Sequence, residues 1–303
     1  MTTRSARVAL GLTLLTTAAH AEGPLDDHHA DGYYWARGGA VAGAISATIV
    51  TRALLEPARP EPGPSEWLGW DNTVRGRLST AASDATDVTL VTTIAVPVGA
   101  GLVQGLDMRL VNTSLLYSEV VIANLLLNTV VKYTAPRLRP YNYRVPPATT
   151  YVASQGVDAY LSFYSGHAST AFAAAVGGSY LFAAANPDSA ANPWLWGAET
   201  ALAAATAIGR IRAGKHFYSD VAVGVVVGTA LGVGIPLLEG VHRRPSATEM
   251  AFAGGGVLLG GFAAAIVPFQ EDIEPEGRTT PFGLKIVPAF SHRSAGLSAI
   301  GNF

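Results

Sequence analysis

Residues 221–238 read VAVGVVVGTALGVGIPLL, an uncharged run in which valine, leucine and glycine dominate. A run of this length and composition can cross the hydrocarbon core of a membrane as a helix. Its small residues recur at intervals of four, as in Gly224 and Gly228, and this spacing favours close helix packing in lipid. The run therefore predicts a membrane-spanning helix that packs against a neighbouring helix.

Similar apolar segments lie on both sides of this run. Residues 88–106, 168–187 and 251–270 are uncharged, and residues 113–131 and 195–208 carry one glutamate each, Glu119 and Glu199. No alternation typical of β-strands separates them. We therefore expect an all-α, multi-helix bundle that is mostly membrane-embedded. A soluble bundle with alanine-rich buried helices is the alternative, and the weakly hydrophobic residues 168–187 suit it.

The composition of the 303-residue chain agrees with a membrane protein. Apolar residues make up 49% and charged residues 14%, whereas soluble domains carry about 25% charged residues. The formal net charge is −2, which gives no nucleic-acid footprint, so no nucleic-acid partner is expected. Because the chain has no cysteine, disulfides, thiolate metal sites and cysteine nucleophiles are excluded.

The N-terminus has the composition of an export signal. Arg4 and Arg7 precede the apolar residues 8–19, and the small residues of Ala19-His20-Ala21 resemble a cleavage site. The polar stretch that follows, residues 22–32, contains several aspartates and two histidines. No second ligand cluster follows at a suitable spacing, so we expect a solvated tail there and not a metal site.

The chain divides into four parts on this basis. Residues 1–21 are the expected signal peptide, and residues 22–87 hold the polar tail, a short apolar helix and a proline-rich connection. Residues 88–240 form the helical core, and residues 241–303 hold one more apolar helix and a short irregular tail. This tail can be irregular or can form a small hairpin, and the sequence does not decide between the two.

Three clusters of basic and histidine residues lie at the edges of the apolar segments. They are KYTAPRLRP at residues 132–140, YSGH at residues 164–167 and GRIRAGKHFYSD at residues 209–220. Charged groups are costly inside lipid and are retained there mainly for function. These clusters are therefore the candidate functional residues.

The clusters contain groups that can bind a phosphate. Lys132, Arg139 and Arg210 are cations, and guanidinium groups match the geometry of phosphate oxygens. Ser165 and Gly166 open a predicted helix, whose backbone N–H groups can also hold an anion. The sequence therefore predicts a binding site for a phosphate dianion.

The clusters also contain groups that can react. His216 and Asp220 are four residues apart and share one face if a helix begins there. A carboxylate that fixes one ring nitrogen leaves the other nitrogen free to attack, and His167 is then available as an acid. Together these groups predict phosphoryl transfer through a phosphohistidine, with no metal or other cofactor.

Each cluster also has a structural explanation when it is taken singly. His167 can be a satisfied histidine at a helix start, and His216–Asp220 an ordinary surface pair. The first cluster can be a positive flank of the preceding helix. The other basic residues of these loops are expected to tune the field, contact the rest of the substrate or be solvated; they are Arg137, Arg144, Arg212 and Lys215. The tyrosines of the first cluster are expected at the membrane interface; they are Tyr133, Tyr141 and Tyr143.

In their order and spacing, the three clusters resemble the motifs of the type 2 phosphatidic acid phosphatase and vanadium haloperoxidase superfamily. The resemblance implies that His216 is the nucleophile, that Asp220 orients it and that His167 protonates the leaving oxygen. It also implies that a set of polar residues holds the phosphate, namely Lys132, Arg139, Ser165, Gly166 and Arg210.

Two positions depart from the family's pattern. Tyr164 stands where the family usually has proline, which affects the rigidity of the loop and the fit of the substrate. Gly209 stands where the family usually has serine, which removes one hydroxyl contact to the phosphate. Neither position carries a group that changes charge or bonds to phosphorus in the reaction.

The resemblance implies a metal-independent phosphatase of the cell envelope that hydrolyses phosphate monoesters or diphosphates, with lipid phosphates as the expected substrates. A soluble periplasmic acid phosphatase is the first alternative. A vanadate-dependent haloperoxidase and a non-catalytic membrane binding protein are the others.

The expected location is the inner membrane, with the site facing the periplasm. A cleaved signal and an outward site are compatible only if residues 38–55 do not span the membrane, which is the arrangement that we expect. Residues 107–112, 188–194 and 239–250 are then inner loops, and their arginines agree with the positive-inside rule.

Overall fold

The structure is a computed structural model that describes residue 25 and residues 31–61, 69–145, 149–269, 285–291 and 294–300. The predicted signal peptide and the aspartates and histidines at residues 26–29 lie outside the described residues. Both predictions for these segments remain predictions.

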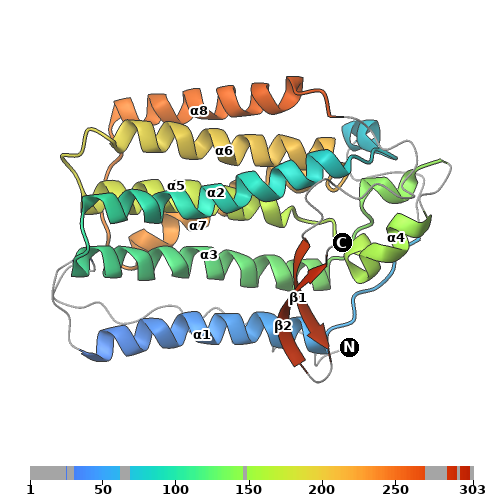
Figure 1. Ribbon diagram of the computed structural model, residues 1–303, viewed down its shortest axis with the longest axis horizontal. Helices are drawn as coiled ribbons and strands as arrows, with labels where there is room; N and C mark the ends of the chain where they lie inside the picture. The colour runs from blue at the N-terminus through green and yellow to red at the C-terminus, as the bar shows by residue number, and fades with distance from the viewer. Residues whose placement is uncertain are drawn as a thin grey trace.

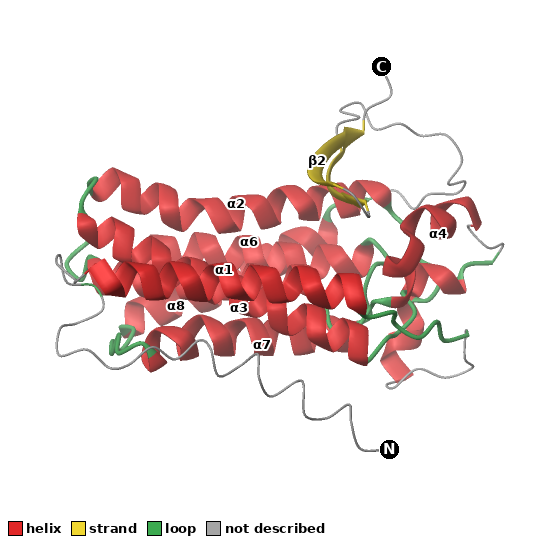
Figure 2. Cartoon of the chain, turned by 90° about the horizontal axis from the view of Figure 1, so that it is seen from below, coloured by secondary structure: helices red, strands yellow, loops and turns green. Residues whose placement is uncertain are grey.

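The described chain is dominated by long helices that lie side by side, as Figures 1 and 2 show from two directions. The long helices are α1 (Asp31–Leu54), α2 (Thr80–Gln104), α3 (Met108–Thr134), α5 (Gly166–Ala185), α6 (Asn192–Arg212), α7 (Tyr218–Leu238) and α8 (Ala247–Ile266). Shorter helices lie in the connections, namely α4 (Thr149–Gln155), η1 (Gly69–Val74), η2 (Pro140–Tyr143) and η3 (Gly156–Tyr160). The prediction of an all-α bundle is confirmed.

The C-terminal tail is not wholly irregular. Strands β1 (Lys285–Ser291) and β2 (Ser294–Ile300) pair antiparallel, with Lys285 opposite Ile300. The tail therefore contains the hairpin that the sequence left open.

In the part of the chain that the structure describes, five helices are long and apolar enough to cross a membrane, namely α2, α3, α5, α7 and α8. Their outer faces expose large apolar side chains such as Val226, Leu258 and Phe262, which are 67%, 75% and 65% exposed. Such exposure is costly in water and suits a lipid environment. The helices therefore support a membrane-embedded bundle.

Helix α5 lies at the centre of the bundle, and nearly all of its residues are buried. It packs against α7 through the glycines that the sequence singled out. A Cβ atom at Gly224 would lie 2.8 Å from the carbonyl oxygen of Ser165, and a Cβ atom at Gly228 would collide with that of Ser169. The predicted close packing of this glycine-rich helix against a neighbour is therefore present, because the glycines bring the backbones of α5 and α7 into close contact.

The two ends of the bundle differ. The connections after α2, α5 and α7 are short and lie at one end, which we call the opposite end. The connections after α1, α3 and α6 lie at the other end, which we call the site end, together with α4 and the three basic clusters. The site end therefore gathers segments that are far apart in the sequence.

Helix α1 begins before the apolar residues 38–55 and runs beside α3. Near its start, Arg37 is buried and donates to both carboxylate oxygens of Glu119, at 2.9 and 2.8 Å, and to Glu239 at 2.8 Å. A buried charge is tolerated when it is paired in this way. The three residues, from α1, α3 and the end of α7, form an ion cluster that fixes α1 against the bundle.

Candidate active site

His216 is the centre of the site and is almost fully buried, at 1% exposure. Its Nδ1 atom lies 2.8 Å from the carbonyl oxygen of Ser162, so Nδ1 carries the proton and donates it. The Nε2 lone pair is then the reactive position, and the Nη1 group of Arg139 lies 3.1 Å from it. Burial, followed by the cations Arg139 and Lys132, holds the pKa of His216 well below its usual value. The ring is therefore neutral, and the lone pair of Nε2 is unprotonated.

Asp220 reaches His216 through Ser162. The predicted direct hydrogen bond is absent from the described site, because Oδ2 of Asp220 lies 3.8 Å from Nδ1 of His216. That oxygen instead accepts from the Ser162 hydroxyl at 2.5 Å and from the backbone N–H of Phe217 at 2.9 Å. The carboxylate therefore fixes the residue whose carbonyl group fixes the ring.

Arg137 supports Asp220 from behind and is neither solvated nor turned toward a substrate. It is buried, and its guanidinium group donates to Asp220 at 2.5 Å, to Asp71 at 3.0 Å and to Ser219 at 2.8 Å. Asp71, from η1, also accepts from the backbone N–H of Ser219 at 3.1 Å. This network holds the start of α7 and was not predicted, because Asp71 lies in a connection with no motif.

The start of α5 forms a second wall of the site. Ser165 caps the helix by accepting from the N–H of Ala168 at 3.3 Å, and its own N–H donates to the carbonyl oxygen of Asp220 at 3.0 Å. A Cβ atom at Gly166 would lie 2.7 Å from Oδ1 of Asn128 and 3.7 Å from Nζ of Lys132. A larger residue at position 166 would therefore force the Asn128 side chain to shift, and glycine allows α5 to start this close to α3 without that shift.

The loop before α5 is held by Asn128. Its side-chain amide donates to the carbonyl oxygen of Tyr164 at 2.9 Å, and Tyr164 itself is buried. At the position where the family usually has proline, the loop therefore has a hydrogen bond from α3 and a packed aromatic ring. Asn128 was not predicted, because a single asparagine in an apolar helix carries no specific signal.

Two cations of the site have donors to spare. The ammonium group of Lys132, at the end of α3, makes no direct ion pair with any residue that the structure describes. Arg210 uses Nη1 on the hydroxyl groups of Ser83 and Thr86, at 3.2 and 3.1 Å, while its buried Nε atom has no hydrogen-bond partner in the described chain. Buried donors are rarely left unpaired, so these groups favour an anionic ligand.

Gly209 is explained by the same contact between α2 and α6. A Cβ atom at Gly209 would collide with the methyl group of Thr86. Glycine at this position lets α2 and α6 lie close together. Arg210 then donates to the hydroxyl group of Thr86, where the family usually has a serine hydroxyl beside the arginine.

His167 has a partner that the sequence did not reveal. Its Nε2 atom lies 2.7 Å from Oδ1 of Asp87 on α2, and the same oxygen lies 3.7 Å from Nη1 of Arg210. Asp87 directly precedes the uncharged residues 88–106, and this position at the edge of an apolar segment was the available signal. The pair makes His167 a candidate for moving a proton.

The segment formed by α4 and η3 covers the remaining side of the site. Lys215 donates to Gln155 at 3.0 Å, and its Nζ atom lies 5.3 Å and 4.9 Å from the ring centres of Tyr141 and Tyr151. Tyr141 is fully buried against the protein, and the expected position of the tyrosines at a membrane interface stays a prediction. On η3, Asp158 accepts from Nη2 of Arg139 at 2.7 Å.

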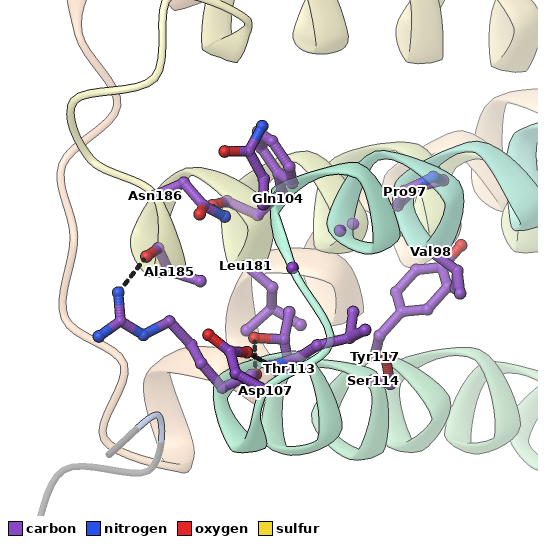
Figure 3. A pocket seen from close by; sticks show the side chains of 16 residues that line it. Pro97, Val98, Gln104, Asp107, Thr113, Ser114, Tyr117, Leu181, Ala185 and Asn186 are labelled. Atoms are coloured by element: carbon purple, nitrogen blue, oxygen red, sulfur yellow. Dashed lines mark hydrogen bonds between the residues drawn. The ribbon is translucent and has the colours of Figure 1, made fainter. Parts of the chain in front are cut away.

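A cavity at the opposite end is remote from this chemistry. It has a volume of about 190 Å³ and lies between α2, α3 and α5, as Figure 3 shows. Its lining includes Gln104, Asp107, Tyr117 and Asn186 but none of the predicted site residues. The cavity therefore does not contribute to the candidate site.

In the part of the chain that the structure describes, no group of three or more histidines, aspartates or glutamates is placed to hold a metal ion. The predicted metal-free reaction remains a prediction.

Comparison with known proteins assigns the central part of the chain. Residues 113–243 match the model of a family described as the PAP2 superfamily. The matched segment contains every residue of the three clusters, whereas Asp71 and Asp87 lie before it. No curated protein and no solved structure matches the chain.

Proposed function

Because residues 113–243 form a PAP2 superfamily domain, we propose that the protein is a metal-independent phosphatase of the cell envelope that hydrolyses phosphate monoesters or diphosphates. The observation that carries the proposal is the position of His216 Nε2 among three cations, Lys132, Arg139 and Arg210. Cations crowded in this way bind a dianion well and repel a divalent metal ion.

In the proposed first step, the Nε2 lone pair of His216 attacks phosphorus. A P–N bond forms, the P–O bond to the leaving group breaks, and His167 gives its proton to the departing oxygen. The proton stays on Nδ1 of His216 and donates to the carbonyl oxygen of Ser162 at 2.8 Å, which stabilises the positive charge that develops on the ring.

In the proposed second step, water attacks the phosphohistidine. The now neutral His167 takes a proton from the water, and the P–N bond breaks. Phosphate then leaves the site, and His216 is back in its starting form. In both steps, the cations and the N–H groups at the start of α5 stabilise the negative charge on the equatorial oxygens of the phosphoryl group.

Lipid phosphates are the proposed substrate class. The site lies at the end of a bundle whose outer helices expose large apolar side chains, including Val226 on α7 and Val88 on α2. A lipid phosphate would keep its chains beside these helices while its head group enters the site. The proposed location is the inner membrane with the site end facing the periplasm.

The test is an activity assay on the detergent-solubilised full chain. Phosphate release is measured from p-nitrophenyl phosphate and from a panel of lipid phosphates and diphosphates, with excess chelator present. We expect release from the wild type and none from His216→Ala. His242→Ala is the matched control, because this exposed histidine lies at the opposite end.

A second measurement tests the intermediate. Acid-quenched wild type is expected to carry acid-labile phosphate on His216, and vanadate is expected to inhibit. Full activity in His216→Ala or a strict requirement for added magnesium would refute the mechanism. Absence of phosphate release from every substrate would favour a non-catalytic binding protein instead.

A further inference from the structure

Arg139 is almost completely occupied by the protein itself. A guanidinium group has five N–H donors. Nε donates to the carbonyl oxygen of Asp158 at 2.7 Å, and Nη2 donates to the carboxylate of the same residue at 2.7 Å. Nη1 donates to the carbonyl oxygen of Lys215 at 3.0 Å and lies 3.1 Å from Nε2 of His216. Little of Arg139 is left for a ligand.

This arrangement conflicts with the proposed reaction, on which the present inference rests. The Nε2 lone pair that would attack phosphorus already accepts a hydrogen bond from Arg139. The guanidinium group that would hold the phosphate is already paired with a carboxylate. Arg139 must therefore leave both His216 and Asp158, at least in part, before the reaction begins.

Asp158 is placed to compete with a phosphate. It lies on η3 with 48% of its side chain exposed, and it is the carboxylate that contacts Arg139 directly. Although burial opposes ionisation, the cations Arg139, Lys132 and Lys215 hold the pKa of Asp158 below its usual range. The carboxylate is thus an anion among the cations that are proposed to bind the substrate.

We propose that Asp158 is a positioning residue that acts as an internal competitor of the phosphate. In the substrate-free protein, its carboxylate holds Arg139 on His216 and caps the nucleophile. A phosphate that enters the site takes Arg139 from Asp158 and frees the Nε2 lone pair. When the product phosphate leaves, Asp158 recovers Arg139, and this competition limits product inhibition.

The test compares Asp158→Asn with wild type in the full-length, detergent-solubilised protein. We expect KM and the inhibition constant of inorganic phosphate to fall together by about tenfold, with no rise in kcat. A tenfold change corresponds to a competent state, with Arg139 released, in about a tenth of the substrate-free molecules. Asp158→Glu keeps the charge and is expected to stay close to wild type. Asp158→Ser replaces Asp158→Asn if that variant fails to fold.

Glu61→Gln is the matched control for charge. Glu61 is exposed in the connection after α1, so its substitution removes one negative charge without changing the partners of Arg139. We expect its KM and phosphate inhibition constant to remain those of wild type. An equal fall in this variant would show a general effect of net charge and would overturn the proposal.

A second measurement separates this inference from the proposed function. The dissociation constant of inorganic phosphate is obtained from the phosphate dependence of the thermal unfolding midpoint, which needs no turnover. Tighter phosphate binding in Asp158→Asn supports the inference even if no substrate is hydrolysed. Unchanged or weaker phosphate binding in the folded variant overturns it, even if wild type is an active phosphatase.

Discussion

His216 stays neutral in the structure because it is buried and surrounded by cations, which hold its pKa well below the usual value. Protonation would block its Nε2 lone pair, so a lowered pKa keeps the nucleophile available in acid. We predict that kcat/KM for p-nitrophenyl phosphate shows no loss that titrates near the usual histidine pKa of about 6.5. Pre-steady-state rates measured from about pH 4 to pH 8 check this.

A variant tests the cause of this shift. Lys132→Gln removes one of the cations that disfavour the protonated ring, so the pKa of His216 rises. The acid limb of the profile is then expected to move to higher pH, in addition to a weaker binding of phosphate. An acid limb that stays in place would assign the lowered pKa to burial and to the remaining cations, Arg139 and Arg210.

The roles of the two histidines differ in their dependence on the leaving group. We predict that His167→Ala slows the hydrolysis of alkyl phosphates by about 100- to 10,000-fold, because an alkoxide needs a proton to leave. A nitrophenolate leaves as the anion, so a burst of nitrophenol is expected, followed by slow turnover. Equal loss of the burst with both leaving groups would show that His167 only holds the phosphate or the fold.

Asp87 provides a companion test for the same role. Its contact with Nε2 of His167, at 2.7 Å, orients the ring and strengthens it as a base. Asp87→Asn is expected to slow alkyl phosphate hydrolysis more than the nitrophenol burst, in the same direction as His167→Ala but less. Asp188→Asn, in the connection after α5, is the control and is expected to leave both rates unchanged.

The residues that carry the motifs could be predicted from the sequence, and their supports could not. His216, His167 and the cations stand out because charges are rare in an apolar chain. Ser162, Asn128 and Asp158 act only through contacts that folding makes. The partners of Ser162 and Asn128 lie 54 and 36 positions away along the chain, and Arg139, the partner of Asp158, lies 19 positions away. A motif fixes spacing along the chain and contains no information on such partners.

At the scale of elements, the close contact of α5 and α7 depends on glycine. We predict that Gly228→Ala lowers the free energy of unfolding by about 1 to 3 kcal/mol, because its Cβ atom would collide with the backbone of Ser169. Thermal unfolding in detergent measures the effect. Gly234→Ala, also on α7, is the matched control, because nothing described lies within 4 Å of its Cβ position.

An equal change in both variants would mean that glycine acts through helix propensity and not through contact. The sequence predicted the glycine face of α7, whereas only the structure shows that α5 covers it.

The start of α2 was missed for a different reason. Thr80 follows the cap Ser79, and the first turns carry Asp84 and Asp87, so a search for uncharged segments begins the helix too late.

At the scale of the whole molecule, the alternation of the helices predicts sidedness. Reporters fused after residues 145 and 215 are expected on one side of the membrane, since both positions follow helices that end at the site end. A reporter at residue 245 is expected on the other side. The proposed orientation places the first two in the periplasm. A cytoplasmic signal at residue 145 would reverse this orientation, and a common side for residues 145 and 245 would contradict the bundle as a membrane-spanning unit.

The start of α1 lies at the opposite end. The side of the membrane on which α1 begins tests the predicted signal peptide, because a cleaved signal leaves the chain start in the periplasm. Helix α1 is not among the five helices of the described chain that are long and apolar enough to span a membrane, and the expectation that its apolar segment does not cross stays a prediction. In the proposed orientation the opposite end faces the cytoplasm, so a reporter placed directly before Asp31 is expected on the cytoplasmic side, as for residue 245. A periplasmic reporter there, as a cleaved signal requires, would contradict the position of α1 along the bundle beside α3.

The ion cluster of Arg37 also constrains the order in which the protein is assembled. Glu119 and Glu239 are synthesised 82 and 202 residues after Arg37, so the charge of Arg37 has no partner while the first part of the chain leaves the ribosome. Helix α1 therefore cannot dock until α3 is made, and the cluster lacks its second carboxylate until α7 is complete. Its first half must wait in a polar setting, such as the membrane surface or the insertion machinery, and a chain truncated before Glu239 would expose an incomplete cluster to quality control.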